Sequence, residues 1–331
     1  MLRLVLVAAL MVVLAALAPA LARCDAGERE IKFGAWFDAN AFARFRAAGL
    51  VQRTVNQEMQ GKVCITLTGS ADTLGGAAGL SALREGQVQM LAAPFADLAP
   101  MQADYGAFQM PFGFRNLAAV ERFQKARSVS LYRALESKGL RPLAFWHEGF
   151  DHMASAVPVF APQTLAGKRL WRGESGAYEA FAPPLKAVAH TASENQLELA
   201  IKQKRVGVVF GDWTELNASG SARQLGHALE AHVRFRGHQL MAGRTFWDGL
   251  EANVRRDLLG IIQRITTQVN FETEGRLKGA MRTLMRGGVK MGTLTRMQRE
   301  KFRAALGTLR QPYLDASPEL AAAIEASNKG L

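Results

Sequence analysis

Histidine and aspartate are the residue types of this chain that could carry acid–base or metal chemistry. The sequence has six histidines, and the closest pairs are each five residues apart: His147 with His152, and His227 with His232. Two ligands on one helix face are three or four residues apart, so neither pair predicts a shared metal site. Asp151 beside His152 could form half of an acid–base pair, but one such neighbour often arises by chance. The sequence therefore predicts no metal site and no cofactor.

The sequence patterns of common catalytic sites are absent. There is no G-x-S-x-G nucleophile elbow, no G-x-G-x-x-G or Walker loop for phosphates, and no H-E-x-x-H zinc motif. An exported α/β enzyme is an alternative that would need an acid–base or nucleophile constellation, and none is found. We therefore expect a protein that is not an enzyme.

The first 22 residues differ in composition from the rest of the chain. Arg3 is their only charge, residues 4–18 are apolar, and Pro19 breaks the run ahead of an A-L-A cleavage sequence. This pattern predicts a secretory signal peptide that is cleaved after Ala22. The alternative is a retained membrane anchor, because the apolar segment approaches the roughly 20 residues that span a bilayer. We expect an exported protein.

Only two cysteines occur, which excludes a zinc ribbon, a four-thiolate cluster and a disulfide scaffold by count. Export to an oxidising compartment would permit Cys24 and Cys64 to pair. Cys64 lies in the strand-like run Val63–Leu67, and Cys24 precedes a second such run, Ile31–Phe33. If these strands are neighbours in a parallel sheet, a disulfide ties down the N-terminal end. Two unpaired thiols are the alternative.

Basic residues exceed acidic ones, and the excess is not uniform. Lysine and arginine total 41 against 29 aspartates and glutamates, which gives a formal charge of +12 and an isoelectric point near 10.1. Between Glu251 and Arg310 there are 13 basic and five acidic residues. Nucleic-acid binding would need aromatic side chains interleaved with that stripe, and only Phe271 and Phe302 occur there. We expect a solvated helix face and no nucleic-acid partner; contact with an acidic partner protein is the alternative.

Strand-like and helix-like segments alternate along the chain, which is typical of an α/β protein. Strands are predicted at 31–34, 62–68, 88–92, 143–146, 168–172 and 206–210. Helices are predicted at 40–60, 77–85, 117–138 and 193–204. The stretch from the third strand to Phe114, rich in proline, alanine and aromatic residues, is expected to be a loop. From Leu250 to about Arg286 the helical pattern continues, which predicts one long helix that spans more than one lobe.

Several short motifs occur in an order that resembles a known family. They are Ile31–Gly34, Val55–Val63, Thr73–Gly75, Leu83–Val88, Met110–Phe114, Gly139–Leu143 with Trp146 and Gly149, Val157–Pro158, Pro162–Gly167 with Glu174 and Ser175, Gly207–Val209, Phe246–Leu250 and Gly287–Val289. Their order and spacing over nearly all of residues 30 to 310 resemble the solute receptors of TRAP transporters, the DctP-type family. The resemblance implies an α/β, two-lobed periplasmic binding protein fold, with a long helix bracing both lobes and a ligand enclosed between them by hinge closure.

The resemblance also implies a division of the chain and a function. The first lobe is expected to hold residues 23–150 plus about 240–275, and the second residues 151–239 plus about 276–331. The protein would be a periplasmic receptor that captures a small organic acid or related solute and delivers it to TRAP membrane permease subunits. An orphan or sensory receptor of the same fold, not coupled to transport, is the alternative.

The chain departs from the family at the positions that bind ligand. Most members carry an arginine in the strand after the P-x-x-L-x-G turn, where it grips a substrate carboxylate with two hydrogen bonds, and this chain has Trp171 there. Arg172 follows, but adjacent residues of a strand point to opposite faces, so Arg172 would need a bulge to serve. Arg169 shares the face of Trp171 and is the other candidate. Asp151 stands where the family often has a basic residue.

The residues at the expected ligand cleft are aromatic and mixed in charge, which suits a pocket for a small solute. The resemblance implies these ligand-binding residues: Trp36, Phe37, Trp146, Glu148, Asp151, Arg169, Trp171, Arg172, Asp212 and Trp213. Trp171 and Arg172 are expected at the centre of the site. Asp151 and Asp212 could instead pair with a cation or an amino group. For each tryptophan, ordinary core packing is the alternative.

Overall fold

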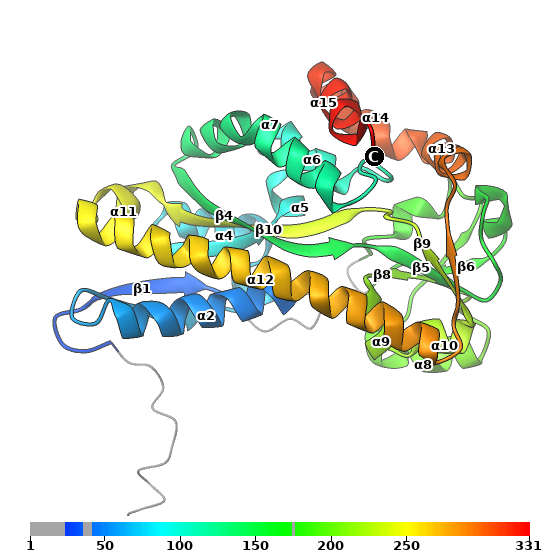
Figure 1. Cartoon of the computed structure of the whole chain (residues 1–331), viewed down its shortest axis with the longest axis horizontal. Helices are drawn as coiled ribbons and strands as arrows, with labels where there is room; N and C mark the ends of the chain where they lie inside the picture. The colour runs from blue at the N-terminus through cyan, green and yellow to red at the C-terminus, as the bar shows by residue number, and fades with distance from the viewer. Residues whose placement is uncertain (1–23, 36–41, 174–175) are drawn as a thin grey trace, which may run out of the picture.

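The computed structural model describes residues 24–35, 42–173 and 176–331, which form two β-sheets with helices packed around them (Figure 1). Within this described part, the first sheet has five strands in the order β2-β1-β3-β10-β4. Their bounds are β1 Arg29–Gly34, β2 Val63–Thr68, β3 Met90–Pro94, β4 Leu140–Phe150 and β10 Phe235–Gly243. Strand β1 pairs in parallel with β2 and β3, whereas β10 is antiparallel to β3 and β4.

The second sheet has six strands among the described residues, in the order β11-β9-β5-β8-β6-β7. Their bounds are β5 His152–Ser155, β6 Arg169–Trp171, β7 Val188–His190, β8 Val208–Gly211, β9 His227–Glu230 and β11 Lys290–Thr293. The apolar run of β8 is buried throughout, because Val208 and Phe210 enter the core on one face of the sheet and Val209 enters the core on the other. These two covered sheets confirm the predicted fold class.

Two stretches of chain cross from one sheet to the other. Strand β4 continues into β5 with only Asp151 between them, and residues 231–234 connect β9 to β10. The two crossings are hydrogen-bonded to each other. The Asp151 amide donates to the Arg234 carbonyl at 2.9 Å, and the Val233 amide donates to the Asp151 carbonyl at 2.8 Å. These crossing strands, β4–β5 and β9–β10, place Asp151 and Arg234 where the two sheets meet.

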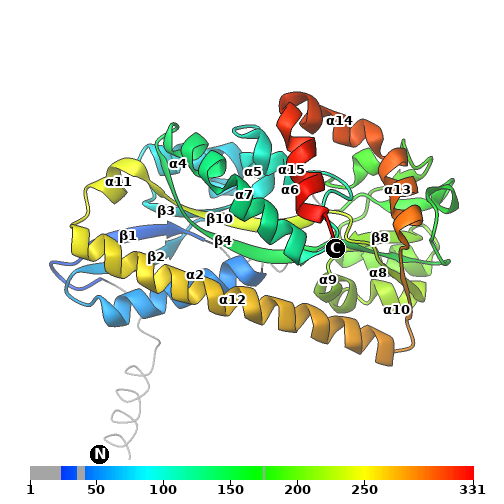
Figure 2. The same cartoon turned by 45° about the horizontal axis from the view of Figure 1, so that its top comes forward.

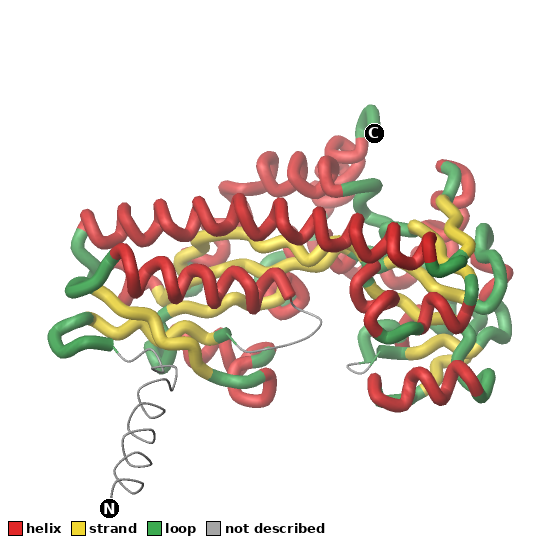
Figure 3. Tube along the Cα trace, turned by 60° about the horizontal axis from the view of Figure 1, so that its bottom comes forward, coloured by secondary structure: helices red, strands yellow, loops and turns green. Residues whose placement is uncertain are grey.

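The 35-residue helix α12 (Ala252–Arg286) runs past both sheets (Figure 3). At about 1.5 Å per residue, it extends for roughly 50 Å. Its buried residues from Val254 to Val269 belong to a core of the first sheet. Ala280 and Leu284, near its end, belong to a core of the second sheet. The structure therefore confirms the predicted helix that braces both lobes.

Shorter helices cover the sheets. Around the first sheet these are α2 Phe42–Glu58, α3 Ala71–Leu74, α4 Gly76–Arg84, α5 Phe95–Leu98, α6 Ala103–Gln109, α7 Leu117–Glu136 and α11 Arg244–Asp248. Around the second they are α8 Glu194–Lys202, α9 Trp213–Ala218, α10 Ser221–Leu225 and the 3₁₀ helices η1 Pro162–Leu165 and η2 Glu179–Phe181.

Helices α5 and α6 correct the prediction of a loop before Phe114. Phe95, Tyr105 and Phe108 are fully buried in one core, and the ring centroids of Phe95 and Phe108 are 4.5 Å apart. Packing of this kind supplies most of the stability of short helices. The helical period over four to seven residues is too short to be read from the sequence.

The chain ends in three helices: α13 Arg296–Ala305, α14 Gly307–Ala316 and α15 Pro318–Asn328 (Figure 2). Leu320 and Ile324 of α15 lie in the same core as Phe123 of α7, beside the first sheet. The division of the chain into lobes remains a prediction. The structure argues for two changes to it, because residues 318–328 pack with the first lobe and residues 235–239, in β10, belong to the first sheet.

The Cys24–Cys64 disulfide is formed, with the two Cα atoms 5.4 Å apart. Cys64 lies on β2, and its register partner on β1 is Glu30. The parallel pairing of these two strands brings the segment before β1 to Cys64, as the sequence predicted. The disulfide therefore confirms the predicted pairing.

Within the described residues, the search for a helix long and apolar enough to cross a membrane finds none. The predicted signal peptide and its cleavage site after Ala22 lie outside the described residues.

Candidate functional site

The crossing strands carry charged side chains on one face and aromatic ones on the other. Side chains alternate between the two faces of a strand, so Arg234 and Arg236 point to one face and Phe235 to the other. Pairing with β4 continues this pattern. Phe150 is the partner of Phe235, and the two rings are in contact, with centroids 5.1 Å apart.

A β-bulge in β4 changes the alternation next to the crossing. The register with β10 shifts there, so that His147 and Gly149 have partners on β10 and Glu148 between them has none. Gly149 has a φ of +103°, which L side chains rarely adopt. Bulges re-aim side chains. Here the bulge leaves the Glu148 carboxylate buried beside His238, with Oε1 and Nδ1 3.6 Å apart.

Arg236 is surrounded by three carboxyl groups. Its Nη2 lies 2.6 Å from Asp212 Oδ2, its Nη1 lies 2.7 Å from Glu215 Oε1, and its Nε lies 3.1 Å from Asp151 Oδ1. These carboxyls come from the crossing strands and from α9. One guanidinium group therefore ties both crossings to the first helix that follows β8.

Arg234 lies beside Arg236 and shares one of its partners. Its Nε is 3.1 Å from the other oxygen of Asp151, and its Nη2 donates to the Tyr178 hydroxyl at 3.2 Å. The same guanidinium lies over the Tyr178 ring, 4.9 Å from its centroid. We call the set of these side chains the junction cluster: Asp151, Tyr178, Asp212, Glu215, Arg234 and Arg236.

A capping box on α9 positions two of the carboxyls. Asp212 Oδ1 accepts hydrogen bonds from the amides of Thr214 and Glu215 at 2.6 and 3.0 Å, and Glu215 Oε2 accepts from the Asp212 amide at 2.8 Å. This reciprocal pattern satisfies amides at a helix N-terminus that have no partner inside the helix. The second oxygen of each carboxyl is then directed at Arg236.

The junction cluster holds more acids than bases. Three carboxyls face two guanidinium groups, which gives a formal charge of −1 when all are ionised. Burial raises the pKa of Glu215 to about 7 against the attraction of Arg236, and Asp212 and Asp151 raise it further. Burial by itself would lower the pKa of Arg236, but the three carboxyls raise it well above its usual value.

The side chains of Arg234 and Arg236 are partly exposed, whereas the central carboxyl is buried. The side chains of Arg234 and Arg236 are 15% and 19% exposed, whereas that of Asp151 is 0% exposed. The central carboxyl of the cluster is therefore more deeply buried than the two arginine side chains that pair with it.

A second polar group adjoins the junction cluster and is centred on Glu148. Its Oε1 accepts a hydrogen bond from the Arg44 amide at 3.1 Å, and its Oε2 lies 4.0 Å from Arg276 Nη2. Arg276 also donates to the hydroxyl of Thr214 on α9. Glu148 thus connects α2, β4 and α12 beside the junction cluster.

The structure brings three of the predicted ligand residues into these groups. Asp151 and Asp212 both contact Arg236, and Glu148 lies in the adjoining group. Trp36 and Phe37 lie outside the described residues.

The predicted residues of β6 bond elsewhere. The Trp171 indole donates to a carbonyl just before α8 at 2.8 Å, and its ring packs against the core between the second sheet and its helices. Arg172 pairs with Glu179 at 3.3 Å, and Arg169 donates to a carbonyl just after α8 at 3.1 Å. The guanidinium groups at the junction therefore come from β10 and the segment before it, not from β6.

Trp146 and Trp213 are core residues in this structure. Trp146 is 0% exposed, packs on Phe33 and donates from its indole to a threonine hydroxyl of α12. Trp213 is 4% exposed and stacks on His152 with ring centroids 4.0 Å apart. For Trp146 the structure agrees with the core-packing alternative, whereas Trp213 also lines a cavity of about 240 Å³.

Sequence reasoning missed four residues of the junction cluster: Tyr178, Glu215, Arg234 and Arg236. One signal was available for the arginines, because the run Arg-Phe-Arg-Gly-His from Arg234 alternates basic residues with uncharged ones, as a half-polar strand does. Another was available for the glutamate, because Asp-Trp-Thr-Glu from Asp212 has the spacing of a capping box.

A cavity of about 240 Å³ lies on the opposite, aromatic face of the crossing strands. It is lined by Leu117, His147, Gly149, Phe150, His152, Trp213, Glu230, His232, Phe235, Asn270, Thr273, Glu274, Leu277, Lys278 and Met281. Burial lowers the pKa of His147 and His232 to about 4 and that of His152 well below its usual value. These imidazoles are neutral near pH 7, so they provide no positive charge to bind an organic anion, whereas the junction cluster has two guanidinium groups.

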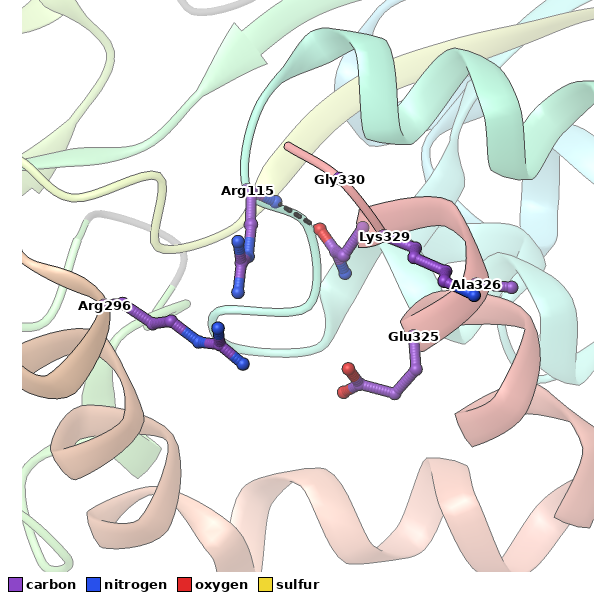
Figure 4. A pocket seen from close by; sticks show the side chains of 7 residues that line it. Arg115, Arg296, Glu325, Ala326, Lys329 and Gly330 are labelled. Atoms are coloured by element: carbon purple, nitrogen blue, oxygen red, sulfur yellow. Dashed lines mark hydrogen bonds between the residues drawn. The ribbon is translucent and has the colours of Figure 1, made fainter.

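Another, more open cavity of about 440 Å³ lies beside the C-terminal helices (Figure 4). Its lining is Arg115, Arg296, Glu325, Ala326, Asn328, Lys329 and Gly330. The Arg115 amide closes one side of it by donating to Asn328 Oδ1 at 2.8 Å. Solute pockets are mostly apolar with a few placed polar groups, and Ala326 is the one apolar side chain in this lining. We interpret this cavity as a charged surface hollow.

The chain matches a known family over most of its length. Residues 39–315 match the family model described as bacterial extracellular solute-binding protein, family 7. The C4-dicarboxylate-binding periplasmic protein DctP of Vibrio cholerae is 26% identical over 312 residues, which cover 94% of each chain. The protein of the same name from Rhodobacter capsulatus is 30% identical over 198 residues, which cover 58% of each chain.

Solved structures of such receptors share the fold. A TRAP periplasmic solute binding protein from Pseudomonas aeruginosa with bound L-malate has a TM-score of 0.68 and 25% identity, covering 86% of this chain and 100% of that one. A second, from Shewanella oneidensis with bound succinate, has a TM-score of 0.74 at 18% identity, covering 91% and 100%. The fold agrees with the family match, and the chain belongs to the bacterial extracellular solute-binding protein family 7, a family of solute receptors rather than of enzymes.

Proposed function

We propose that this protein is a periplasmic receptor that binds a small organic acid at the junction cluster. The observation that carries the proposal is the pair of guanidinium groups, Arg234 and Arg236, placed where the two lobes meet. A guanidinium binds a carboxylate with two parallel hydrogen bonds. Each has five N–H donors, and Arg234 uses two of them in its bonds to Asp151 and Tyr178. Donors therefore remain for a ligand.

Arginine at this place would compensate for the tryptophan at the carboxylate-binding position of β6. The family resemblance puts the carboxylate-binding arginine at the position of Trp171. We infer that β10 and the segment before it supply the cation instead, so that the centre of the site lies at Arg234 and Arg236 rather than at Trp171 and Arg172. Asp151 and Asp212 then orient the guanidinium groups instead of holding a cationic ligand.

The relatives indicate which acids to test first. Two of them are named for binding C4-dicarboxylates, and two similar structures hold L-malate and succinate. Another, from Roseobacter denitrificans at 14% identity, holds β-D-glucuronate. A panel of these three acids covers four-carbon diacids and a sugar acid, and all three present at least one carboxylate.

We further infer that the protein is exported with cleavage after Ala22, that it delivers its solute to TRAP membrane permease subunits, and that it leaves the solute chemically unchanged. The disulfide Cys24–Cys64 supports export, because such bonds persist in oxidising compartments. N-terminal sequencing of the exported protein tests the cleavage site. A chain that still begins at Met1 would contradict it.

Titration calorimetry with the three acids tests the site. Arg236→Lys keeps the positive charge among the three carboxyls but removes the planar fork, and Arg234→Lys does the same for its neighbour. Hydrogen bonds to charged groups contribute about 1.5–3 kcal/mol, so each variant should bind the preferred acid about 10- to 100-fold more weakly. Arg172→Lys is the matched control, since Arg172 pairs with Glu179 near the surface.

Two results would contradict this assignment. The first is that both variants at Arg234 and Arg236 bind as the unaltered protein does, while Arg172→Lys binds more weakly. This result would show that the centre of the site lies at β6. Absence of binding by all three acids would contradict the proposed ligand class.

A further inference from the structure

We propose that binding of an organic acid at the junction cluster draws one proton from solvent onto the carboxyl group of Glu215. This inference rests on the proposed function, because it concerns the charge balance of the same site. Its basis is that three carboxyls, those of Asp151, Asp212 and Glu215, surround one guanidinium group at 2.6 to 3.1 Å. With Arg234 included, the acids still exceed the bases by one.

A bound carboxylate adds a negative charge to a cluster that already has one in excess. Like charges that share a partly desolvated site cannot all remain ionised without cost, and the pKa of one of them rises. Uptake of one proton returns the cluster and a singly charged ligand to the formal charge that the cluster had before binding. The free guanidinium donors then bind the ligand without added repulsion.

Glu215 is the carboxyl whose protonation disturbs the fewest contacts. Asp151 is completely buried and forms ion pairs with both guanidinium groups. Asp212 accepts two backbone amides at the start of α9 besides its bond to Arg236. Glu215 has one guanidinium contact and one backbone contact. Protonated, it keeps an acceptor oxygen for each and gains an O–H donor.

Some charged groups on the elements around α9 raise the pKa of Glu215, and others lower it. Those that act on it are Arg236 of β10, Asp151 between β4 and β5, Asp212 at the start of α9 and Tyr178 before η2. Arg276 of α12 bonds instead to the neighbouring Thr214. Arg223 of α10 bonds instead to Asn217, near the other end of α9. Arg236 favours ionised Glu215, and the two aspartates favour the protonated form. A ligand carboxylate adds to the negative charge of the aspartates and so favours the protonated form of Glu215.

The uptake of a proton determines whether the affinity for the acid rises or falls with pH. One O–H bond forms on the Glu215 carboxyl, one bond to hydrogen breaks in a buffer acid or hydronium ion, and the solute is unchanged. At a pH where Glu215 is already protonated in the free protein, binding takes up no proton. At higher pH it takes up one, so the affinity falls by up to tenfold for each pH unit.

The test is titration calorimetry of L-malate, succinate and β-D-glucuronate in buffers that differ in ionisation enthalpy, such as phosphate and Tris. The change of the observed enthalpy with buffer ionisation enthalpy gives the number of protons taken up. We expect a value approaching one near pH 8 and close to zero near pH 5.5. Glu215→Gln should abolish the uptake and bind more tightly than the unaltered protein near pH 8. Glu179→Gln is the control, because Glu179 pairs with Arg172 outside the junction cluster.

The outcomes separate this inference from the proposed function. If none of the acids binds, the proposed function fails. If an acid binds with the same enthalpy in all buffers near pH 8, the function stands and the proton coupling is wrong. If the uptake persists in Glu215→Gln, another group takes the proton and the assignment to Glu215 is wrong. The proton count of the unaltered protein tests the coupling even if Glu215→Gln does not fold.

Discussion

Replacing Arg236 by alanine would leave three carboxyl groups without the guanidinium that contacts all of them. Removal of one partner from a buried ion pair costs about 3–5 kcal/mol, because the remaining charge stays buried. Asp151 and Asp212 are 0% and 2% exposed, which puts this site in the buried class. We expect Arg236→Ala to lower the free energy of unfolding by about 3–5 kcal/mol.

Urea unfolding measures this change, and two further variants show its origin. Arg172→Ala breaks an ion pair whose glutamate is 63% exposed, and such pairs contribute about 0–1 kcal/mol. Glu215→Gln in the Arg236→Ala background removes one of the abandoned charges and should recover part of the loss. If Arg236→Ala costs no more than Arg172→Ala, the junction cluster is a solvated surface group and our account of its energetics is wrong.

Three other predictions follow from the described contacts. Reduction of Cys24–Cys64, whose residues are 40 apart, should cost about 4 kcal/mol by loop-closure entropy, measured as the loss in urea stability on adding reductant; no loss would contradict it. Burial lowers the pKa of His232 from 6.5 to about 4, so the stability that its neutral form contributes is complete above about pH 6.5 and is lost as the pH falls towards 4. His232→Gln should flatten that part of the pH–stability profile. An unchanged profile would show that His232 is not the source of this pH dependence. Gly149→Ala should destabilise the protein by about 1–3 kcal/mol, since φ is +103° and the new Cβ would lie 2.5 Å from Leu277 Cδ1; an unchanged unfolding midpoint would show that the bulge adapts.

The sequence was informative where an element is long or its pattern is uninterrupted. Helix α12 was predicted because its apolar period continues over 35 residues, and β8 because its apolar run is continuous. Strand β10 was not predicted, because Arg236 and His238 interrupt its apolar residues and make the stretch read as polar. Of these two, Arg236 belongs to the junction cluster and His238 lies beside Glu148 in the adjoining group, so the residues that hid the strand are the ones that we propose to serve the site.

Only two of the six junction-cluster residues could be predicted, because the contacts of the cluster depend on pairing between distant segments. Asp151 and Asp212 were found by their places relative to family motifs. Arg236 lies 24 residues after Asp212 in sequence and still further from Asp151, and the antiparallel pairing of β10 with β4 is what brings it to both. The carboxylate-binding arginine was sought near Trp171 on β6, because the resemblance placed it there, and the alternation of basic and uncharged residues from Arg234 was not recognised as a strand pattern.

The most direct test of the account is a crystal structure of the protein with L-malate bound. Our account predicts a ligand carboxylate with its oxygens about 3 Å from guanidinium nitrogens of Arg234 and Arg236, enclosed between the two lobes. A carboxylate held instead by Arg172 or Arg169, with Arg234 and Arg236 still paired only to their own acids, would contradict it.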